Sequence, residues 1–139
     1  MIDHVSLPVR TLAASARFYD GVLGAIGYAR LVERERTIGY GKRYAALWIN
    51  ARPGMAPAPA DCGAHVCLRA RSAAEVDAFH AAALTLGGTD DGPPGPREHD
   101  TPDQVYYAAF VRDPDGNRIE AVTFLLSPLR RGEGLPAAG

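Results

Sequence analysis

The sequence has 139 residues, of which 47% are hydrophobic and 22% charged, a balance typical of one globular domain rather than a disordered chain. Its 15 basic and 16 acidic residues leave a net charge of −1, so we expect no nucleic-acid partner. No apolar run is long enough to span a membrane and the N-terminus lacks a secretory signal pattern. We therefore expect no membrane partner, a cytoplasmic location and reduced cysteines.

An internal repeat organises the chain. Residues 3–27 align without gaps with residues 64–88, and eight of the 25 aligned pairs are identical, His4 with His65 among them. Such self-similarity marks a duplicated structural unit. We therefore expect one domain over residues 1–127, made of a first module (1–50), a linker (51–63) and a second module (64–127), followed by a tail over 128–139.

Each module is predicted to open with a strand and a helix. In residues 3–9, Val and Leu alternate with other residues, which is the period of a strand with one buried face. Apolar residues recur at helical spacing over 12–23, and the glycines that follow end the helix. The second module repeats the pattern, with a strand over 64–70 and a helix that begins at a Ser72 cap and ends near Leu86.

Further strands are predicted to complete each module. They are 28–35, 37–41 and 43–50 in the first module, and 104–112 and 117–125 in the second. The last two flank Asp113-Pro114-Asp115-Gly116-Asn117, whose Pro and Gly favour a tight antiparallel turn. Residues 92–103, rich in Pro and Gly, are predicted to be a long loop that acts as a lid. The expected fold class is α+β, with two βαβββ modules pairing into a curled, partly open, barrel-like sheet and the helices outside.

The strand face turned away from the helix carries the candidates for chemistry. His4 lies on this face in the first module, and His65 and Cys67 hold the matching face in the second. A near-twofold relation between the modules would bring the two histidines together across a cleft. Pairing the last two strands around their turn places Glu120 opposite Phe110 on the same side.

Glu120 among apolar neighbours needs a compensating positive charge. Two imidazoles and one carboxylate on three strands form a metal site that leaves coordination positions open. The residues therefore indicate a metal bound by His4, His65 and Glu120. Two alternatives stay open: the histidines are ordinary polar strand residues, and Glu120 is the ion-pair partner of an arginine.

Several further side chains are expected around this site. Those predicted to line a substrate pocket are Trp48, Cys67, Arg69, Tyr106, Phe110 and Arg118. The aromatic residues would form walls for a flat ligand, and the arginines would either hold a substrate carboxylate or neutralise Glu120. His99, in the predicted lid, is a candidate general acid/base; the alternative is an exposed loop histidine. The remaining catalytic residues are unknown.

Motifs at both ends and in the middle of the chain support a family resemblance. They are Asp3-His4-Val5-Ser6-Leu7 followed by Phe18-Tyr19, then His65-Val66, and finally Asp113-Pro114-Asp115-Gly116-Asn117-Arg118-Ile119-Glu120. With them the chain resembles the vicinal oxygen chelate superfamily, the glyoxalase/bleomycin resistance/dioxygenase proteins. The resemblance implies a divalent metal (Fe, Mn, Zn, Ni or Co) on His4, His65 and Glu120, a small substrate with adjacent oxygens, and a homodimer, in which some relatives build each site from two chains.

Two positions depart from the best-known members of that family. The place of the fourth ligand of glyoxalase I enzymes falls on Trp48, which cannot ligate a metal, and the substrate-binding tyrosine of extradiol dioxygenases falls on Phe110. These departures disfavour both activities, and we expect a metal-dependent lyase, isomerase or oxygenase that acts on a compound with two adjacent oxygens. The alternative is a binding protein that sequesters a small molecule or an antibiotic.

Overall fold

A computed structural model describes residues 1–98 and 103–127 of the chain. The element order is β-α-β-β-β twice, which confirms the predicted duplication. The first module contains β1 (Val5–Val9), α1 (Leu12–Gly24), β2 (Ala29–Glu33), β3 (Thr37–Gly41) and β4 (Ala45–Ala51). The second contains β5 (His65–Arg69), α2 (Ala73–Thr85), β6 (Thr89–Arg97), β7 (Gln104–Arg112) and β8 (Arg118–Leu126). His99 and the predicted tail over 128–139 lie outside the described residues.

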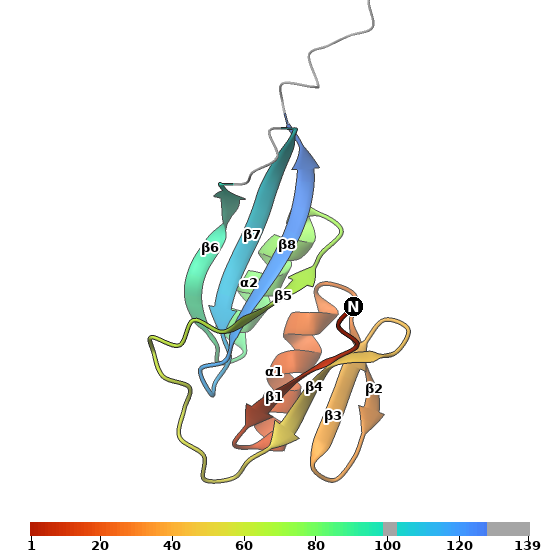
Figure 1. Cartoon of the computed structure of the whole chain (residues 1–139), viewed down its shortest axis with the longest axis vertical. Helices are drawn as coiled ribbons and strands as arrows, with labels where there is room; N and C mark the ends of the chain where they lie inside the picture. Colours follow the sequence, from red (N-terminus) through yellow and green to blue (C-terminus); the bar gives the residue numbers. More distant parts are fainter. Residues whose placement is uncertain (99–102, 128–139) are drawn as a thin grey trace, which may run out of the picture.

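Each module forms its own four-stranded sheet. The strand orders are β1-β4-β3-β2 and β5-β8-β7-β6, with the first strand of each module parallel to the last. The two modules follow each other along the long axis of the molecule (Figure 1), and α1 and α2 contact each other. The α+β class with two modules is confirmed, and the two sheets remain separate rather than closing into a barrel.

The register of the strands confirms the predicted face assignment. Phe110 lies opposite Glu120, and Cys67 lies opposite Glu120 on the other side. In the first module Ser6 lies opposite Trp48. Because the two parallel strand pairs share one register, Trp48 occupies the place that Glu120 occupies in the second module.

The prediction of a lid over residues 92–103 is wrong for its first half. Strand β6 runs from Thr89 to Arg97 and pairs with β7, with register shifts around Gly92 and before Gly95. Proline has no N–H to donate to a neighbouring strand, but β6 is an edge strand that pairs on one side only, so prolines are tolerated there. Bulges accommodate the positions where the pairing is irregular. The pairing with β7 therefore outweighs the loop-like composition.

The β7–β8 turn joins the second module to the first. The Arg10 guanidinium donates to the Asp115 carboxylate (2.7 Å), and the Tyr19 hydroxyl donates to Asp113 (2.6 Å). The Asn117 amide donates to the carbonyl of Pro8 (2.9 Å). Burial raises the pKa of the Asp113 carboxyl above its usual value. The turn motif seen in the sequence therefore has a structural role at the contact between modules.

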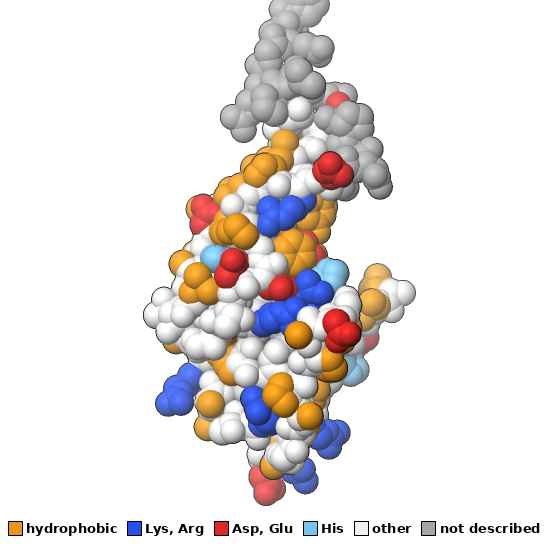
Figure 2. Space-filling view, turned by 90° about the vertical axis from the view of Figure 1, so that its left-hand side faces the viewer, with side chains coloured by type: hydrophobic (Ala, Val, Ile, Leu, Met, Phe, Trp, Pro, Cys, Tyr) orange, Lys and Arg blue, Asp and Glu red, His pale blue; other side chains and the backbone are white. Residues whose placement is uncertain are grey.

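The molecular surface has mixed character. On the face shown in Figure 2, acidic and basic side chains are interspersed with hydrophobic ones, and no broad basic field covers that face.

Both helices have 13 residues. Within the described part of the chain, neither helix has the length and apolar character needed to cross a membrane.

Candidate functional site

Three strands of the second module bring a buried carboxylate, an imidazole and a phenol together. Glu120, on β8, is 2% exposed. Its Oε2 lies 2.9 Å from Nε2 of His65 on β5, and its Oε1 accepts a hydrogen bond from the hydroxyl of Tyr106 on β7. The alternation of side chains along each strand turns all three to one face of the sheet. The structure therefore brings together two of the three predicted metal ligands.

Two neighbours of Glu120, Tyr106 and Cys67, are held in their neutral forms. Burial, followed by the hydrogen bond to Glu120, raises the pKa of Tyr106 well above that of a free phenol. Burial and the Glu120 charge raise the pKa of Cys67 to about 11. The Cys67 sulfur lies 3.8 Å from the Tyr106 oxygen. Tyr106 is therefore a hydrogen-bond donor to Glu120 at neutral pH, and Cys67 is a thiol rather than a reactive thiolate.

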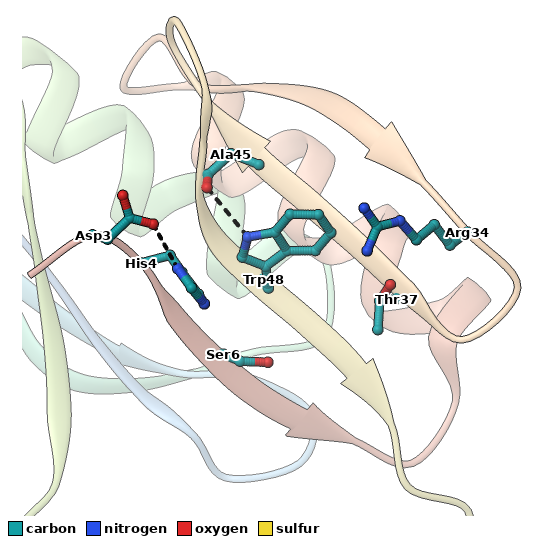
Figure 3. A pocket seen from close by; sticks show the side chains of 7 residues that line it. All are labelled: Asp3, His4, Ser6, Arg34, Thr37, Ala45 and Trp48. Atoms are coloured by element: carbon teal, nitrogen blue, oxygen red, sulfur yellow. Dashed lines mark hydrogen bonds and ion pairs between the residues drawn. The ribbon is translucent and has the colours of Figure 1, made fainter.

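His4 lies in a different part of the molecule. It lines a cavity of about 450 Å³ in the first module, and its Nδ1 lies 2.7 Å from the Asp3 carboxylate. Figure 3 shows this imidazole at the start of β1, beside the Trp48 indole on β4. The Trp48 N–H donates to the carbonyl of Ala45 (3.2 Å), and the Arg34 guanidinium lies 5.1 Å from the indole ring. The first module thus offers one imidazole in an aromatic and cationic setting.

The two predicted histidine ligands line different cavities. His65 borders two cavities of about 300 and 390 Å³ that also contact the first module through Val5, and His4 borders neither of them. Across residues 1–98 and 103–127, no group of three His, Cys, Asp or Glu side chains is close enough to hold a metal ion. A single chain therefore carries an imidazole–carboxylate pair in one module and a separate imidazole in the other.

The predicted pocket residues divide between three places. Cys67, Tyr106 and Phe110 surround Glu120, where the His65 and Phe110 rings are 5.9 Å apart. Arg69 lies on the same face, with its guanidinium 4.3 Å from the Phe124 ring. Trp48 is with His4 instead. Phe124 lies on this face as well, where its alternation with Glu120 along β8 places it.

Arg118 is held by an acidic residue that the sequence analysis missed. The Asp91 carboxylate accepts from Arg118 (2.7 Å) and from Arg112 (3.2 Å). Burial would raise the pKa of Asp91, but the two guanidiniums outweigh it and the pKa is lowered. Arg118 also donates to the carbonyl of Cys62 in the linker (3.2 Å). Its charge is therefore shared with Asp91, and Glu120 has His65 and Tyr106 as its hydrogen-bond partners.

Comparison with known proteins places this arrangement in a family. The sequence profile of the Glyoxalase/Bleomycin resistance protein/Dioxygenase superfamily matches residues 1–121. The chain belongs to this superfamily. No match was found among curated proteins.

Solved structures of the superfamily share the fold. A glyoxalase/bleomycin resistance protein from Albidiferax ferrireducens T118 is 33% identical over 86% of this chain and 95% of its own, with a TM-score of 0.72. A glyoxalase-related enzyme from Fulvimarina pelagi is 22% identical over 88% of this chain and 86% of its own (TM-score 0.66). A glyoxalase I variant from Zea mays is 24% identical over 86% of this chain and 44% of its own (TM-score 0.65). At their identity the last two support the fold alone.

Proposed function

We propose that this superfamily member is a divalent-metal-dependent enzyme, a lyase, isomerase or oxygenase, that binds a small substrate through two adjacent oxygens. The observation that carries the proposal is the contact between His65 and Glu120. A carboxylate that is 2% exposed faces an imidazole nitrogen at 2.9 Å on the open face of a sheet. Burying a carboxylate is unfavourable unless a positive charge or several donors compensate it.

The donor atoms fit a divalent metal. Imidazole nitrogen suits Fe, Ni and Zn, and carboxylate oxygen suits Mn as well. A metal on these atoms requires both ligands to be deprotonated. Tyr106 holds the other carboxylate oxygen and so fixes the orientation of Glu120. The ion, when bound, supplies Lewis-acid stabilisation of negative charge on the substrate oxygens.

We further propose that His4 of a second copy of the chain completes the ligand set. His4 and His65 precede the same register position in their modules, since Val5 pairs with Leu47 as Val66 pairs with Ile119. His4 is about half exposed and therefore accessible to another chain. In a dimer with a twofold axis, the first module of each chain would pack against the second module of the other chain. Two equivalent sites would result.

Two aromatic residues limit which chemistry is proposed. Trp48 occupies the place equivalent to Glu120 and supplies no oxygen or imidazole ligand. Phe110 has no hydroxyl group that could bind a substrate oxygen. A bound metal would therefore have three protein ligands and open positions for both substrate oxygens. The proton that such a reaction moves would pass through bound water or through a group outside the described residues, where His99 remains a candidate.

Metal content tests the proposal directly. Wild-type protein, purified without an affinity tag, is expected to hold close to one metal per chain by elemental analysis. Glu120→Gln keeps the shape and the acceptor for Tyr106 but removes the charge, so it should lose most of the metal while its melting curve stays cooperative. Glu35→Gln, at an exposed position, is the matched control. No metal uptake by folded wild-type protein would refute the proposal.

A mixed dimer tests the shared site. His4→Ala and Glu120→Gln chains, each expected to be metal-free alone, are co-expressed with different tags and isolated as the heterodimer. If each site takes His4 from one chain and His65 and Glu120 from the other, one of the two sites is intact and half of the metal returns. If each chain builds its own site, both sites are damaged and no metal returns.

The second candidate is a small-molecule binding protein without metal chemistry. The observation that favours it is the set of aromatic rings on the face of the second module, Tyr106, Phe110 and Phe124, together with Trp48 in place of a ligand. Metal-free protein whose melting temperature rises with a flat apolar ligand, and not with Zn²⁺ or Mn²⁺, would favour this function.

A further inference from the structure

We propose that Arg69 and Arg97 recognise an anionic group, a carboxylate or an equivalent oxyanion, on the molecule that binds beside Glu120. The inference rests on the proposed function for its location, because it names the substrate class of that same face. Arg97 was not among the predicted site residues, since it lies in the segment that the sequence analysis assigned to a lid.

The register of the second sheet places both arginines on the face of Glu120. One row across the sheet runs Cys67, Glu120, Phe110 and Gly92. The next row runs Arg69, Val122, Ala108 and Gly95, and a third runs Phe124, Tyr106 and Arg97. Apart from Arg69, the middle row has small side chains, and it lies between two rows that carry aromatic rings. On this face of the sheet, Arg69 lies on β5 at one edge and Arg97 lies on β6 at the other.

The two guanidiniums are held over aromatic rings rather than by acids. The Arg69 guanidinium lies 4.3 Å from the Phe124 ring and the Arg97 guanidinium lies 5.7 Å from the Phe110 ring. In residues 1–98 and 103–127, no Asp or Glu lies within ion-pair distance of either. Stacking on a ring fixes the plane of a guanidinium, and the N–H groups that make no hydrogen bond within the protein are then available to an oxyanion.

Local glycines allow Arg97 to reach this position. Its guanidinium donates to the carbonyls of Pro93 (2.7 Å) and Pro96 (3.2 Å) and so folds back along β6. A Cβ on Gly92 would come within 3.3 Å of one guanidinium nitrogen, and a Cβ on Gly95 within 3.4 Å of the other. A side chain at Gly92 would therefore crowd both the Phe110 ring (3.1 Å) and the arginine, whereas a Cβ at Gly95 would only reach van der Waals contact with the arginine.

Other arginines near the site lack this freedom. Arg112 and Arg118 share Asp91, and Arg10 is paired with Asp115. Among the described residues, Glu120 lies within ion-pair distance of His65 and not of an arginine. Two cations on one face, neither of them in an ion pair with an acid in the described part of the chain, attract an anion. A substrate that presents a carboxylate in addition to two adjacent oxygens satisfies both the arginines and the proposed metal.

A pair of ligands that differ by one carboxylate tests the inference. Catechol and 3,4-dihydroxybenzoate present the same adjacent oxygens, and their dissociation constants are measured by calorimetry on Zn²⁺-loaded wild-type protein. We expect the carboxylate to tighten binding by about tenfold, as for a charge-assisted hydrogen bond. Arg69→Gln and Arg97→Gln should each remove most of this preference, measured as the ratio of the two dissociation constants. Arg17→Gln, an exposed position on α1, is the control with the same change of charge and should behave as wild type.

The outcomes separate this inference from the proposed function. Equal affinities for the two ligands in wild-type protein would overturn the anion site while leaving the chelate function in place. If neither ligand binds and Zn²⁺ is not taken up, the chelate function fails; benzoate is then titrated into metal-free protein. Benzoate binding that Arg69→Gln weakens would still support the anion site, and no benzoate binding would overturn it. A change of oligomeric state in the arginine variants would assign these residues to a subunit contact and would also overturn it.

Discussion

The hydrogen bond between Tyr19 and Asp113 provides a quantitative test of how the modules are joined. Tyr19 lies on α1 and Asp113 in the β7–β8 turn, and the phenol donates to the carboxylate at 2.6 Å. Tyr19 is fully buried and Asp113 is 4% exposed. Tyr19→Phe removes one oxygen atom and leaves the packing of the ring unchanged. The variant therefore isolates a single hydrogen bond between the modules.

The expected loss of stability follows from the remaining donors. A hydrogen bond to a charged group contributes about 1.5–3 kcal/mol. In Tyr19→Phe, Asp113 keeps the backbone N–H groups of Asp115 and Asn117 and the Asn117 side-chain amide. We therefore expect a loss of about 2 kcal/mol, which for a chain of this length lowers the melting temperature by about 7 °C.

Urea unfolding at several pH values measures this loss. The hydrogen bond favours the charged form of Asp113, whose pKa burial raises above the usual value. The difference between Tyr19→Phe and wild type should be largest at neutral pH and should shrink as the pH falls and Asp113 becomes protonated in the folded state. Tyr40→Phe is the control, because that buried phenol reaches the partly exposed Asp20 at 3.1 Å. A loss below about 0.5 kcal/mol at neutral pH, or one equal to that of Tyr40→Phe, would refute the reasoning.

Substitutions at three further positions test other parts of the fold. Asp91→Asn should lower the free energy of unfolding by about 1–3 kcal/mol at pH 7. Because the pKa of Asp91 is lowered in the folded state, its stabilisation is present above the unfolded pKa of about 4 and is lost as the pH falls through the folded pKa. The stabilities of wild type and Asp91→Asn, measured by unfolding at decreasing pH, should therefore converge in acid. Gly39→Ala would place a Cβ 3.0 Å from the Trp48 ring, so we expect a shift in the fluorescence of this single tryptophan and a loss of about 1–3 kcal/mol from overpacking; an unchanged spectrum would contradict the close packing. Ser72→Ala removes the oxygen that accepts from the backbone N–H of Glu75 at 3.2 Å and should cost about 1 kcal/mol in thermal unfolding, whereas Ser72→Asp should retain most of it.

Half of the candidate site was predictable because strand geometry is local. Once the turn at 113–117 is recognised, the two-residue period of a strand puts Glu120 opposite Phe110 and on the face of His65. The structure confirms both the pairing and the face. Whether His4 lies beside His65 and Glu120 was not predictable in this way, because that depends on how two modules pack against each other.

The role of Arg118 shows the same limit. Its place on the face of Glu120 follows from the strand period, and the sequence analysis considered it as a partner of Glu120. Its contact with Asp91 depends on where β6 lies, and the composition of β6 favours a loop. Pairing at an edge depends on the rest of the sheet, and here the proline-rich segment forms a strand because it pairs with the edge that β7 offers.

The sequence by itself determined the duplication, the order of helices and strands apart from β6, and the side chains that share each sheet face. These features follow from the repeat and from the periods of helix and strand, which adjacent residues impose on one another. Only the tertiary structure decided that His4 and His65 border different cavities and that Arg97 lies with Arg69 on one face. The modules are joined by hydrogen bonds between residues about one hundred positions apart, such as Arg10 with Asp115. Contacts of that range depend on the packing of whole modules, and no local pattern of residues specifies them.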